Sequence, residues 1–350
     1  MGIKQHYVPQ FILKNWSEDT KNIDIYLVNQ DKYVKGPLRD QAQKHYLYGS
    51  DQRIEDLFCF LENEVSTITR GLLNEIIPTE IETIIRIKMF IVTQYCRTPL
   101  FVKNMNQAIT VLTREILHHS KEFENNEKAI TATSISFTNP AREQIRMILE
   151  ILPSILDLRL CLIRNKTTEE FVIGENPVVI LNPFLIEKGW DASRKGLSLK
   201  GTVIIMPLSP SFSICLYDHM AYGFVGKSRV ASASDNDVKL LNLCQFFNTE
   251  SCIYTNNALA DLKELSIQSE KYRKSVKSYV KTYVAKNTNR KFLLQHSSFN
   301  YPIDEEFSFL GYKSRFLQEE ISFQNEMRET AKEFIDAYKK TDIYQQLHTI

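Results

Sequence analysis

The chain is 350 residues long, and its 43 Lys and Arg residues nearly balance its 42 Asp and Glu residues, giving a formal net charge of +1. Hydrophobic residues make up 43% of the sequence, which excludes an intrinsically disordered chain. The 11 glycines and 11 prolines are too few for a fibrous or low-complexity protein. The balanced charge excludes a uniformly basic surface, but it leaves room for a local basic patch.

The sequence predicts a cytoplasmic protein. Lys4, His6 and Lys14 interrupt any apolar segment that a signal peptide would need near the start. The best apolar stretch, residues 147–156, has only about half of the roughly 20 residues that a membrane-spanning helix requires. The six cysteines form no CxxC pair and lie mostly in apolar runs, which is typical of reduced core thiols rather than of disulfides or zinc ligands.

The first 50 residues predict a small helix-and-hairpin unit. Pro9 suits the first position of a short helix, because the N–H that proline lacks would be unpaired there. Ile12 and Trp16 then lie on one helical face. Alternating residues predict a strand over 23–27, and residues 33–35 are expected to return beside it as a second strand.

Residues 51–152 predict a helical region. Apolar residues recur at steps of three and four from Ile54 to Leu72, as in an amphipathic helix. Thr79 and Glu82 have the spacing of a capping box for the next helix, which is apolar nearly all round and is therefore expected at the centre of the fold. Pro99 is expected to end or kink that helix. Two further helices are predicted, over residues 104–119 and 140–152.

Residues 153–260 predict a sheet. The expected strands are residues 158–163, 171–173, 178–181, 202–206, 212–217 and 252–254. Two prolines in residues 207–211 predict a rigid turn rather than part of a central strand. Ser234 is expected to cap a helix that runs to about residue 248, and helix is expected again from residue 258.

These elements predict the α+β fold class, with a helical N-terminal half packed on a mixed or antiparallel sheet from the second half and a helical C-terminus. The length allows about two domains or one large one. We expect a core over residues 1–260 and a helical, partly basic region over residues 261–350.

Several short motifs resemble one known family. The opening residues 6–16, HYVPQFILKNW, resemble the start of bacterial proteins grouped as "domain of unknown function 4238". Later motifs follow in the same order along the chain. They are Ile54-Glu55 with Glu62, the QYCRTP segment at 94–99, the GENP turn at 174–177, the PLSP turn at 207–210, and Leu241-Asn242. The resemblance spans roughly residues 4–260. It implies a shared fold and a set of site residues but no reaction.

The first candidate site residues are His6 and Gln10. They are four residues apart across Pro9, so both side chains could face one cavity if a helix begins near Val8. Histidine can serve as a general base or a metal ligand near neutral pH. The alternative is that His6 bonds to a backbone carbonyl and braces the N-terminal segment.

A second group lies on the predicted helices. Glu55 and Glu62 are seven residues apart and share a helical face. A half-buried carboxylate there needs a cation, and Arg97 is the natural partner for Glu62. The alternatives are a structural Glu62–Arg97 ion pair and a metal-binding or acid–base role. Gln94 and Arg97 could likewise bind a phosphate or carboxylate, or cap the end of their helix.

Glu175 and Asn176 lie in a turn between two predicted strands. Functional residues often lie on such loops, but short polar side chains in turns also commonly bond to their own backbone. The resemblance implies a site here, although Glu175 stands where the family usually has Asp. That difference moves the carboxylate by one methylene, which would alter a strict metal geometry.

The sequence from residue 271 to residue 291 is basic. It contains eight Lys and Arg residues, no acid and three interleaved tyrosines. On a helix, this run would present a cationic stripe able to meet phosphates. The predicted nucleic-acid-binding residues are Arg273, Lys274, Lys277, Tyr279 and Lys281. The alternative is a solvated helix face balanced by acids that lie later in the chain.

Two functional hypotheses remain open. The first is an enzyme acting on nucleic acid or a nucleotide, such as a metal-dependent nuclease in bacterial defence, with a divalent metal as a candidate cofactor. Its predicted site residues are His6, Gln10, Glu62, Gln94, Arg97, Glu175 and Asn176. The second is a non-catalytic binding or scaffold protein that uses a protein partner or a second copy of itself. P-loop, dinucleotide-binding, HExxH and GxSxG motifs are all missing from the sequence.

Overall fold

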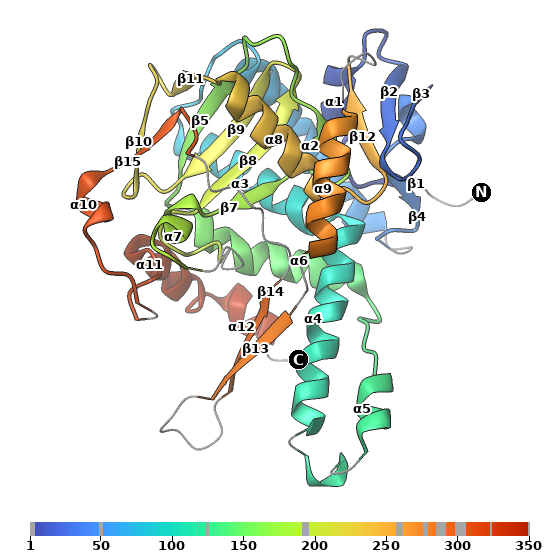
Figure 1. Ribbon diagram of the computed structural model, residues 1–350, viewed down its shortest axis with the longest axis vertical. Helices are drawn as coiled ribbons and strands as arrows, with labels where there is room; N and C mark the ends of the chain where they lie inside the picture. The colour runs from blue at the N-terminus through green and yellow to red at the C-terminus, as the bar shows by residue number, and fades with distance from the viewer. Residues whose placement is uncertain are drawn as a thin grey trace.

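Figure 1 shows the computed structural model of the chain. The structure describes residues 4–48, 52–118, 120–123, 126–190, 196–256, 262–275, 279–284, 292–297, 306–322 and 324–348. It describes the backbone alone at 52, 121, 272–275, 279–284 and 292–297. Helices and sheets occupy separate stretches of the chain, so the predicted α+β class is confirmed.

The helical half lies between the N-terminal strands and the sheet. Its helices are α1 (Gln10–Leu13), α2 (Gln52–Leu72), α3 (Ile81–Cys96), α4 (Pro99–His118), α5 (Glu127–Ala132) and α6 (Pro140–Ile151). The second half of α3 is buried nearly all round, which confirms its predicted central place. Helices α4 and α5 extend away from the rest of the molecule as an arm (Figure 1).

One of the two local predictions at the ends of α3 differs from the structure. Thr79 does not cap α3, because the helix begins at Ile81 after an extended Glu80, and Thr79 bonds to the Glu80 side chain instead. The expected end of the helix near Pro99 is confirmed, since α3 ends at Cys96 and Pro99 starts α4. A proline at the first helical position loses no hydrogen bond, which explains the break.

The larger sheet has five strands in the order β11-β5-β9-β8-β7. Their bounds are β5 (Arg159–Arg164), β7 (Val179–Leu181), β8 (Val203–Ser209), β9 (Phe212–Tyr217) and β11 (Val230–Ser232). All neighbours are antiparallel except β11 and β5. The predicted turn at 207–211 is wrong in part, because β8 continues through Pro207. A register shift between Pro207 and Ser209 accommodates the residue that cannot donate.

A second sheet joins the two ends of the family-like core in the order β3-β2-β12-β6. The N-terminal hairpin supplies β2 (Asn22–Leu27) and β3 (Lys32–Pro37), as predicted. The later sequence supplies β6 (Ile173–Gly174) and β12 (Cys252–Thr255). Short strands β1 (Lys4–His6) and β4 (Gln43–His45) pair separately.

Both faces of the five-stranded sheet are covered. Alternate residues of β5 enter different apolar clusters. Leu160 and Leu162 pack with α2, α3 and α6, whereas Cys161 and Ile163 pack with α7 (Pro183–Glu187) and α8 (Asp235–Phe247). Burial on both faces explains why these strands read as continuous apolar runs. Four cysteines are buried as predicted, but Cys59 is exposed and Cys252 is only partly buried.

The C-terminal region contains more strand than predicted. Helix α9 (Lys263–Ser275) is followed by the paired strands β13 (Tyr279–Val284) and β14 (Phe292–Ser297). Strand β15 (Leu310–Tyr312) pairs with β10 (Tyr222–Phe224). The helical C-terminus is confirmed by α10 (Ser314–Leu317), α11 (Glu329–Tyr338) and α12 (Asp342–His348). Among the described helices, none combines the length and the apolar character that crossing a membrane requires.

Candidate functional site

The segment from His6 to Gln10 lies at the centre of the candidate site. Strand β1 ends at His6, and the Tyr7 N–H donates to the Ala42 carbonyl at 2.8 Å. Pro9 has extended backbone angles and directly precedes helix α1, which begins at Gln10. This strand-to-helix turn leaves the Tyr7 carbonyl available to side chains of α3.

Two buried side chains of α3 clamp that carbonyl. Gln94 Nε2 donates to the Tyr7 oxygen at 2.6 Å, and Arg97 Nε donates to the same oxygen at 3.0 Å. Both residues are almost fully buried, with Gln94 0% and Arg97 1% exposed. The predicted cap of the α3 C-terminus is therefore not their role. They fix the N-terminal segment against the helix.

Arg97 also forms the ion pair that the sequence suggested. Its Nη1 atom lies 2.6 Å from Glu62 Oε1, which joins α3 to α2. Its guanidinium group lies near the ring of Phe58, with 5.9 Å from Cζ to the ring centroid. Its second terminal nitrogen, Nη2, is buried without a hydrogen-bond partner. Arg97 thus makes charge-assisted bonds on one side and has an unused donor on another.

His6 lies at the edge of this cluster and is half-buried. Its Nε2 atom is 3.1 Å from Gln10 Nε2 and 3.1 Å from the Arg39 carbonyl oxygen. Burial lowers the pKa of His6, although the bond to Arg39 and the nearby Glu62 carboxylate act in the opposite direction. The lowered pKa favours the neutral imidazole at pH 7. Its Nε2 atom either donates to the Arg39 carbonyl or accepts from the Gln10 amide, and the tautomer decides which ring nitrogen keeps the lone pair.

A second carboxylate belongs to the same cluster. Burial raises the pKa of Glu55, and the negative charge of Glu62 raises it further. The Cys59 thiol lies 3.9 Å from Glu55 Oε1, on the next turn of α2. Cys59 was expected among the core thiols, so its place beside Glu55 was not predicted. Its position between Glu55 and Glu62 on one helix was the available signal.

Glu175 connects the cluster to the smaller sheet. The Tyr7 hydroxyl donates to Glu175 Oε1 at 3.1 Å, and the Ser251 N–H donates to Oε2 at 2.8 Å. Burial raises the pKa of Glu175. Asn176 has different partners, since its Nδ2 atom donates to the Asn248 carbonyl at 2.6 Å. Asn176 therefore joins its turn to the end of α8, rather than bonding to the backbone of its own turn.

Two tyrosines of the site were missed by sequence reasoning. Tyr7 provides both the carbonyl that α3 clamps and the hydroxyl that reaches Glu175. The Tyr48 hydroxyl donates to the His6 carbonyl at 3.1 Å. Tyr7 lies inside the HYVPQF motif, but sequence spacing carries no information about which chain segments its backbone will meet.

The predicted nucleic-acid interface differs from the structure. Helix α9 ends at Ser275, and residues 279–284 form a strand, so a single cationic helix face over 271–291 is wrong. Residues 279–284 are rich in tyrosine, valine and threonine, and these residue types favour strands. Lys277 and the side chains of Arg273, Lys274, Tyr279 and Lys281 lie outside the described part of the structure.

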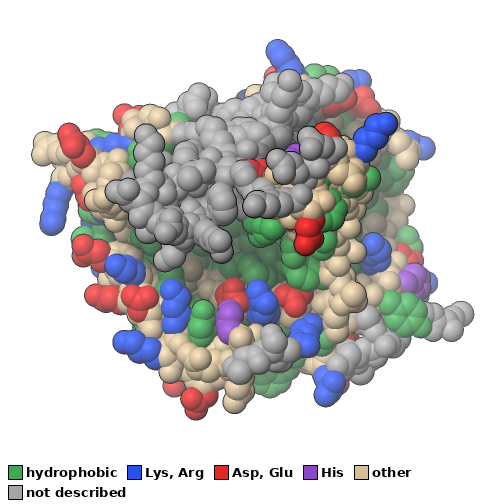
Figure 2. All heavy atoms as spheres, turned by 90° about the horizontal axis from the view of Figure 1, so that it is seen from below, with side chains coloured by type: hydrophobic (Ala, Val, Ile, Leu, Met, Phe, Trp, Pro, Cys, Tyr) green, Lys and Arg blue, Asp and Glu red, His purple; other side chains and the backbone are tan. Residues whose placement is uncertain are grey.

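The described side chains show mixed charge on the face drawn in Figure 2. Lysine and arginine side chains alternate there with aspartate and glutamate around an apolar hollow (Figure 2). Among the described residues, no group of three or more His, Cys, Asp or Glu side chains is placed to hold a metal ion. The site consists of His6, the three carboxylates of Glu55, Glu62 and Glu175, and the buried Arg97.

Fold and site together define an α+β protein whose N-terminal strand-to-helix turn is fixed by a buried arginine–glutamate pair. The model of the family described as "Protein of unknown function (DUF4238)" matches residues 4–258. The chain belongs to this family, and the resemblance of its motifs is thereby confirmed. No curated protein and no solved structure matches the chain.

Proposed function

We propose that the protein is an enzyme that acts on nucleic acid or a nucleotide, with His6 as its general base. The observation that carries this proposal is the position of His6, a half-buried imidazole 3.1 Å from Gln10 Nε2 at the edge of the Glu62–Arg97 pair. Burial lowers the pKa of His6, which favours its neutral form. A base must be unprotonated at working pH and within reach of solvent or substrate, and His6 meets both conditions. Glu62 would stabilise the imidazolium that forms when His6 accepts a proton.

The other predicted residues divide into two roles under this proposal. Gln10 and Glu62 are partly exposed, so they can contact a substrate beside His6. Gln94 and Arg97 are buried and act as positioning residues, since they hold the Tyr7 carbonyl and Glu62. Support for a polyanionic substrate comes from the basic sequence of residues 271–291. One strand of it, β13, pairs with β14, which lies just beyond the basic run, and a two-stranded antiparallel ribbon can enter the major groove of DNA.

The experiment is a turnover screen of DNA, RNA and nucleotides with the purified protein. Each substrate is tested with Mg²⁺, with Mn²⁺ and with a chelator. We expect His6→Asn to lower turnover by about a hundredfold or more, the usual contribution of a general base. His45→Asn is the matched control, because His45 is an exposed histidine on the neighbouring strand β4. Absence of turnover in every arm, or full activity of His6→Asn, would contradict the proposal.

A scaffold function is the second candidate, and a specific observation favours it. Gln94 and Arg97 use their donors on the protein's own Tyr7 carbonyl, so their motif holds the helical half in place. A purely structural site predicts that His6→Asn lowers the melting temperature and changes no activity.

Phage challenge of a bacterial host that carries wild-type or His6→Asn protein tests the broader defence hypothesis.

A further inference from the structure

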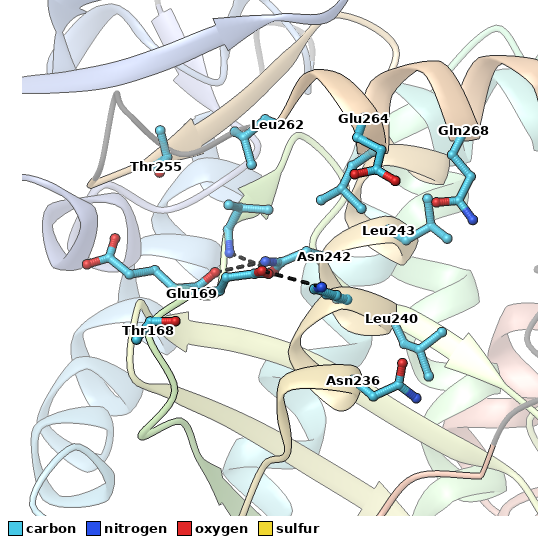
Figure 3. A pocket seen from close by; sticks show the side chains of 14 residues that line it. Thr168, Glu169, Asn236, Leu240, Asn242, Leu243, Thr255, Leu262, Glu264 and Gln268 are labelled. Carbon is cyan, nitrogen blue, oxygen red and sulfur yellow. Dashed lines mark hydrogen bonds and ion pairs between the residues drawn. The ribbon is translucent and has the colours of Figure 1, made fainter.

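A cavity of about 400 Å³ lies between helices α8 and α9. Its described walls come from the loop before β6, from α8, from β12 and from α9, as Figure 3 shows. His6, Glu62 and Arg97 do not line it. The cavity is therefore separate from the proposed active site and needs an explanation of its own.

Asn242 builds one wall of this cavity. The residue is 3% exposed and lies on α8, and the sequence motifs had singled it out without showing a role. Its Nδ2 atom donates to the Glu170 carbonyl at 2.8 Å, and its Oδ1 atom accepts from the Val172 N–H at 2.9 Å. Both amide atoms thus fix the loop beside α8, as the dashed lines in Figure 3 show.

The charges that line the cavity are mainly negative. Glu169, Glu170 and Glu264 contribute three carboxylates, and Lys239 is the one cation among the described lining residues. Lys239 Nζ lies 3.8 Å from Glu169 Oε1, so the charges of these two residues balance each other. Two of the described lining carboxylates remain without a balancing cation. Those two belong to different walls, with Glu170 on the loop and Glu264 on α9.

Glu170 carries the strongest indication of a missing partner. Its Oε2 atom is buried and has no hydrogen-bond partner, although the Asn256 side chain bonds to the same carboxyl group. Burial raises the pKa of this carboxyl group. A buried acceptor without a donor costs free energy, which a ligand that brings an N–H group would recover. A cationic donor satisfies the lone pair and compensates the charge in one contact.

The remaining lining favours a ligand with an aliphatic body. Apolar side chains come from the loop, from α8 and from α9 or the residue just before it. They are Val172, Leu240, Leu243, Leu262 and Leu265. A hydrated metal ion or an inorganic ion would leave these groups unused. Methylene groups between two ammonium groups would bury apolar area against them.

We propose that this cavity binds an aliphatic diamine or polyamine, with its ammonium groups at Glu170 and Glu264 and its methylene chain against the leucines. The two excess carboxylates match the two charges of a diamine. An anionic ligand would instead face three carboxylates and a single lysine that is already paired. The site does not depend on catalysis at His6, so the two proposals can fail separately.

The test is calorimetric titration of the full-length protein with putrescine and with spermidine at physiological ionic strength. The uncharged analogue 1,4-butanediol and Mg²⁺ are titrated as controls for shape and for nonspecific charge. We expect one diamine per chain, no binding of the diol, and no displacement by Mg²⁺. Bound diamine should also raise the melting temperature, because it stabilises only the folded state.

Two variants locate the site. Glu170→Gln and Glu264→Gln should each weaken diamine binding by about tenfold or more, while each keeps the volume of its side chain. Glu333→Gln is the matched control, since Glu333 is exposed on α11 and does not line the cavity. If Glu170→Gln does not fold, Glu264→Gln decides alone, because Glu264 is exposed. Undetectable binding to the wild type, or unchanged affinity in the folded variants, would overturn the proposal.

Discussion

Arg97 shows how one residue organises the candidate site. A guanidinium group that is 1% exposed loses its hydration, and that loss must be offset by partners. The Glu62 carboxylate at 2.6 Å and the Tyr7 carbonyl at 3.0 Å provide the compensation. The three groups belong to segments far apart in the sequence, so the pair ties α2, α3 and the N-terminal turn together.

Replacing Arg97 should therefore destabilise the whole protein. We expect Arg97→Met to lower the free energy of unfolding by about 3–5 kcal/mol, as loss of one partner of a buried ion pair does. Arg86→Met on the same helix is the control. The Arg86–Glu64 pair is 3.8 Å long and nearly half exposed, so its loss should cost at most about 1 kcal/mol. Urea denaturation measures both variants, and equal effects would show that the Arg97 contacts carry no special stability.

His6 should make stability depend on pH. Burial lowers its pKa below the ordinary value of 6.5, so the unfolded chain binds more protons in the interval between the two values. The free energy of unfolding then falls as pH decreases through 6.5. His6→Asn removes this dependence, and its melting temperature should drop less than that of the wild type between about pH 7.5 and about pH 5.5. Parallel melting curves of the two proteins would contradict the assignment.

Helix α8 is the element that connects the two sheets. Its Asn242 and Gln245 side chains accept from the Val172 and Gly174 N–H groups, at 2.9 and 3.0 Å. Their spacing of three residues places both on one helical face, toward β6. Gly174 approaches the segment that follows α8 so closely that a larger residue does not fit. A Cβ atom at this position would lie 2.1 Å from Thr249 Oγ1. Helix α8 therefore fixes the position of β6 in the smaller sheet, and it also forms one wall of the cavity.

The start of α8 is fixed by a complete capping box. Ser234 Oγ accepts from the Asp237 N–H, and Asp237 Oδ2 accepts from the Ser234 N–H at 2.7 Å. Ser234→Ala should lower the free energy of unfolding by about 1 kcal/mol. Thr79→Ala should cost less than about 0.5 kcal/mol, since Thr79 does not cap α3. A loss at Thr79 as large as that at Ser234 would contradict this account.

At the scale of the whole molecule, the C-terminal region is attached to the family-matched core through buried contacts. Arg328 is 4% exposed, and its Nε and Nη2 atoms bond to the two carboxylate oxygens of Asp157 at 2.7 and 3.0 Å. Phe309 and Phe316 pack in the same apolar cluster as α8. Residues beyond position 258 therefore contribute to the apolar cluster around α8, although the family model ends there.

Loss of Arg328 should loosen this attachment. Arg328→Met leaves the Asp157 carboxylate, which is 6% exposed, without its cation, so we expect a destabilisation of about 3–5 kcal/mol. Hydrogen exchange should rise in α11, which begins at Glu329, earlier than in α3. Arg315→Met, at an exposed position on α10, should leave both measurements unchanged. Uniform exchange across the chain would argue for global rather than regional loosening.

Local patterns were sufficient for most elements of the core. The hairpin of β2 and β3, the helices α2 and α6, and the Ser234 cap follow from periodicity and from capping preferences that act over a few residues. The strands at 279–284 and 292–297 were not predicted, because the spacing of the basic residues in 271–291 was interpreted as one face of a helix. Their pairing with each other decides their conformation.

The sequence by itself determined the α+β class, the family and the residues worth testing, because each depends on residue types at short spacing. Only the tertiary structure decided which residues meet. His6, Glu62, Arg97 and Glu175 lie up to 169 residues apart in the chain and come together around Tyr7, whose carbonyl accepts from Arg97 and whose hydroxyl donates to Glu175. Such contacts are selected by the burial of the whole core, which no local pattern encodes.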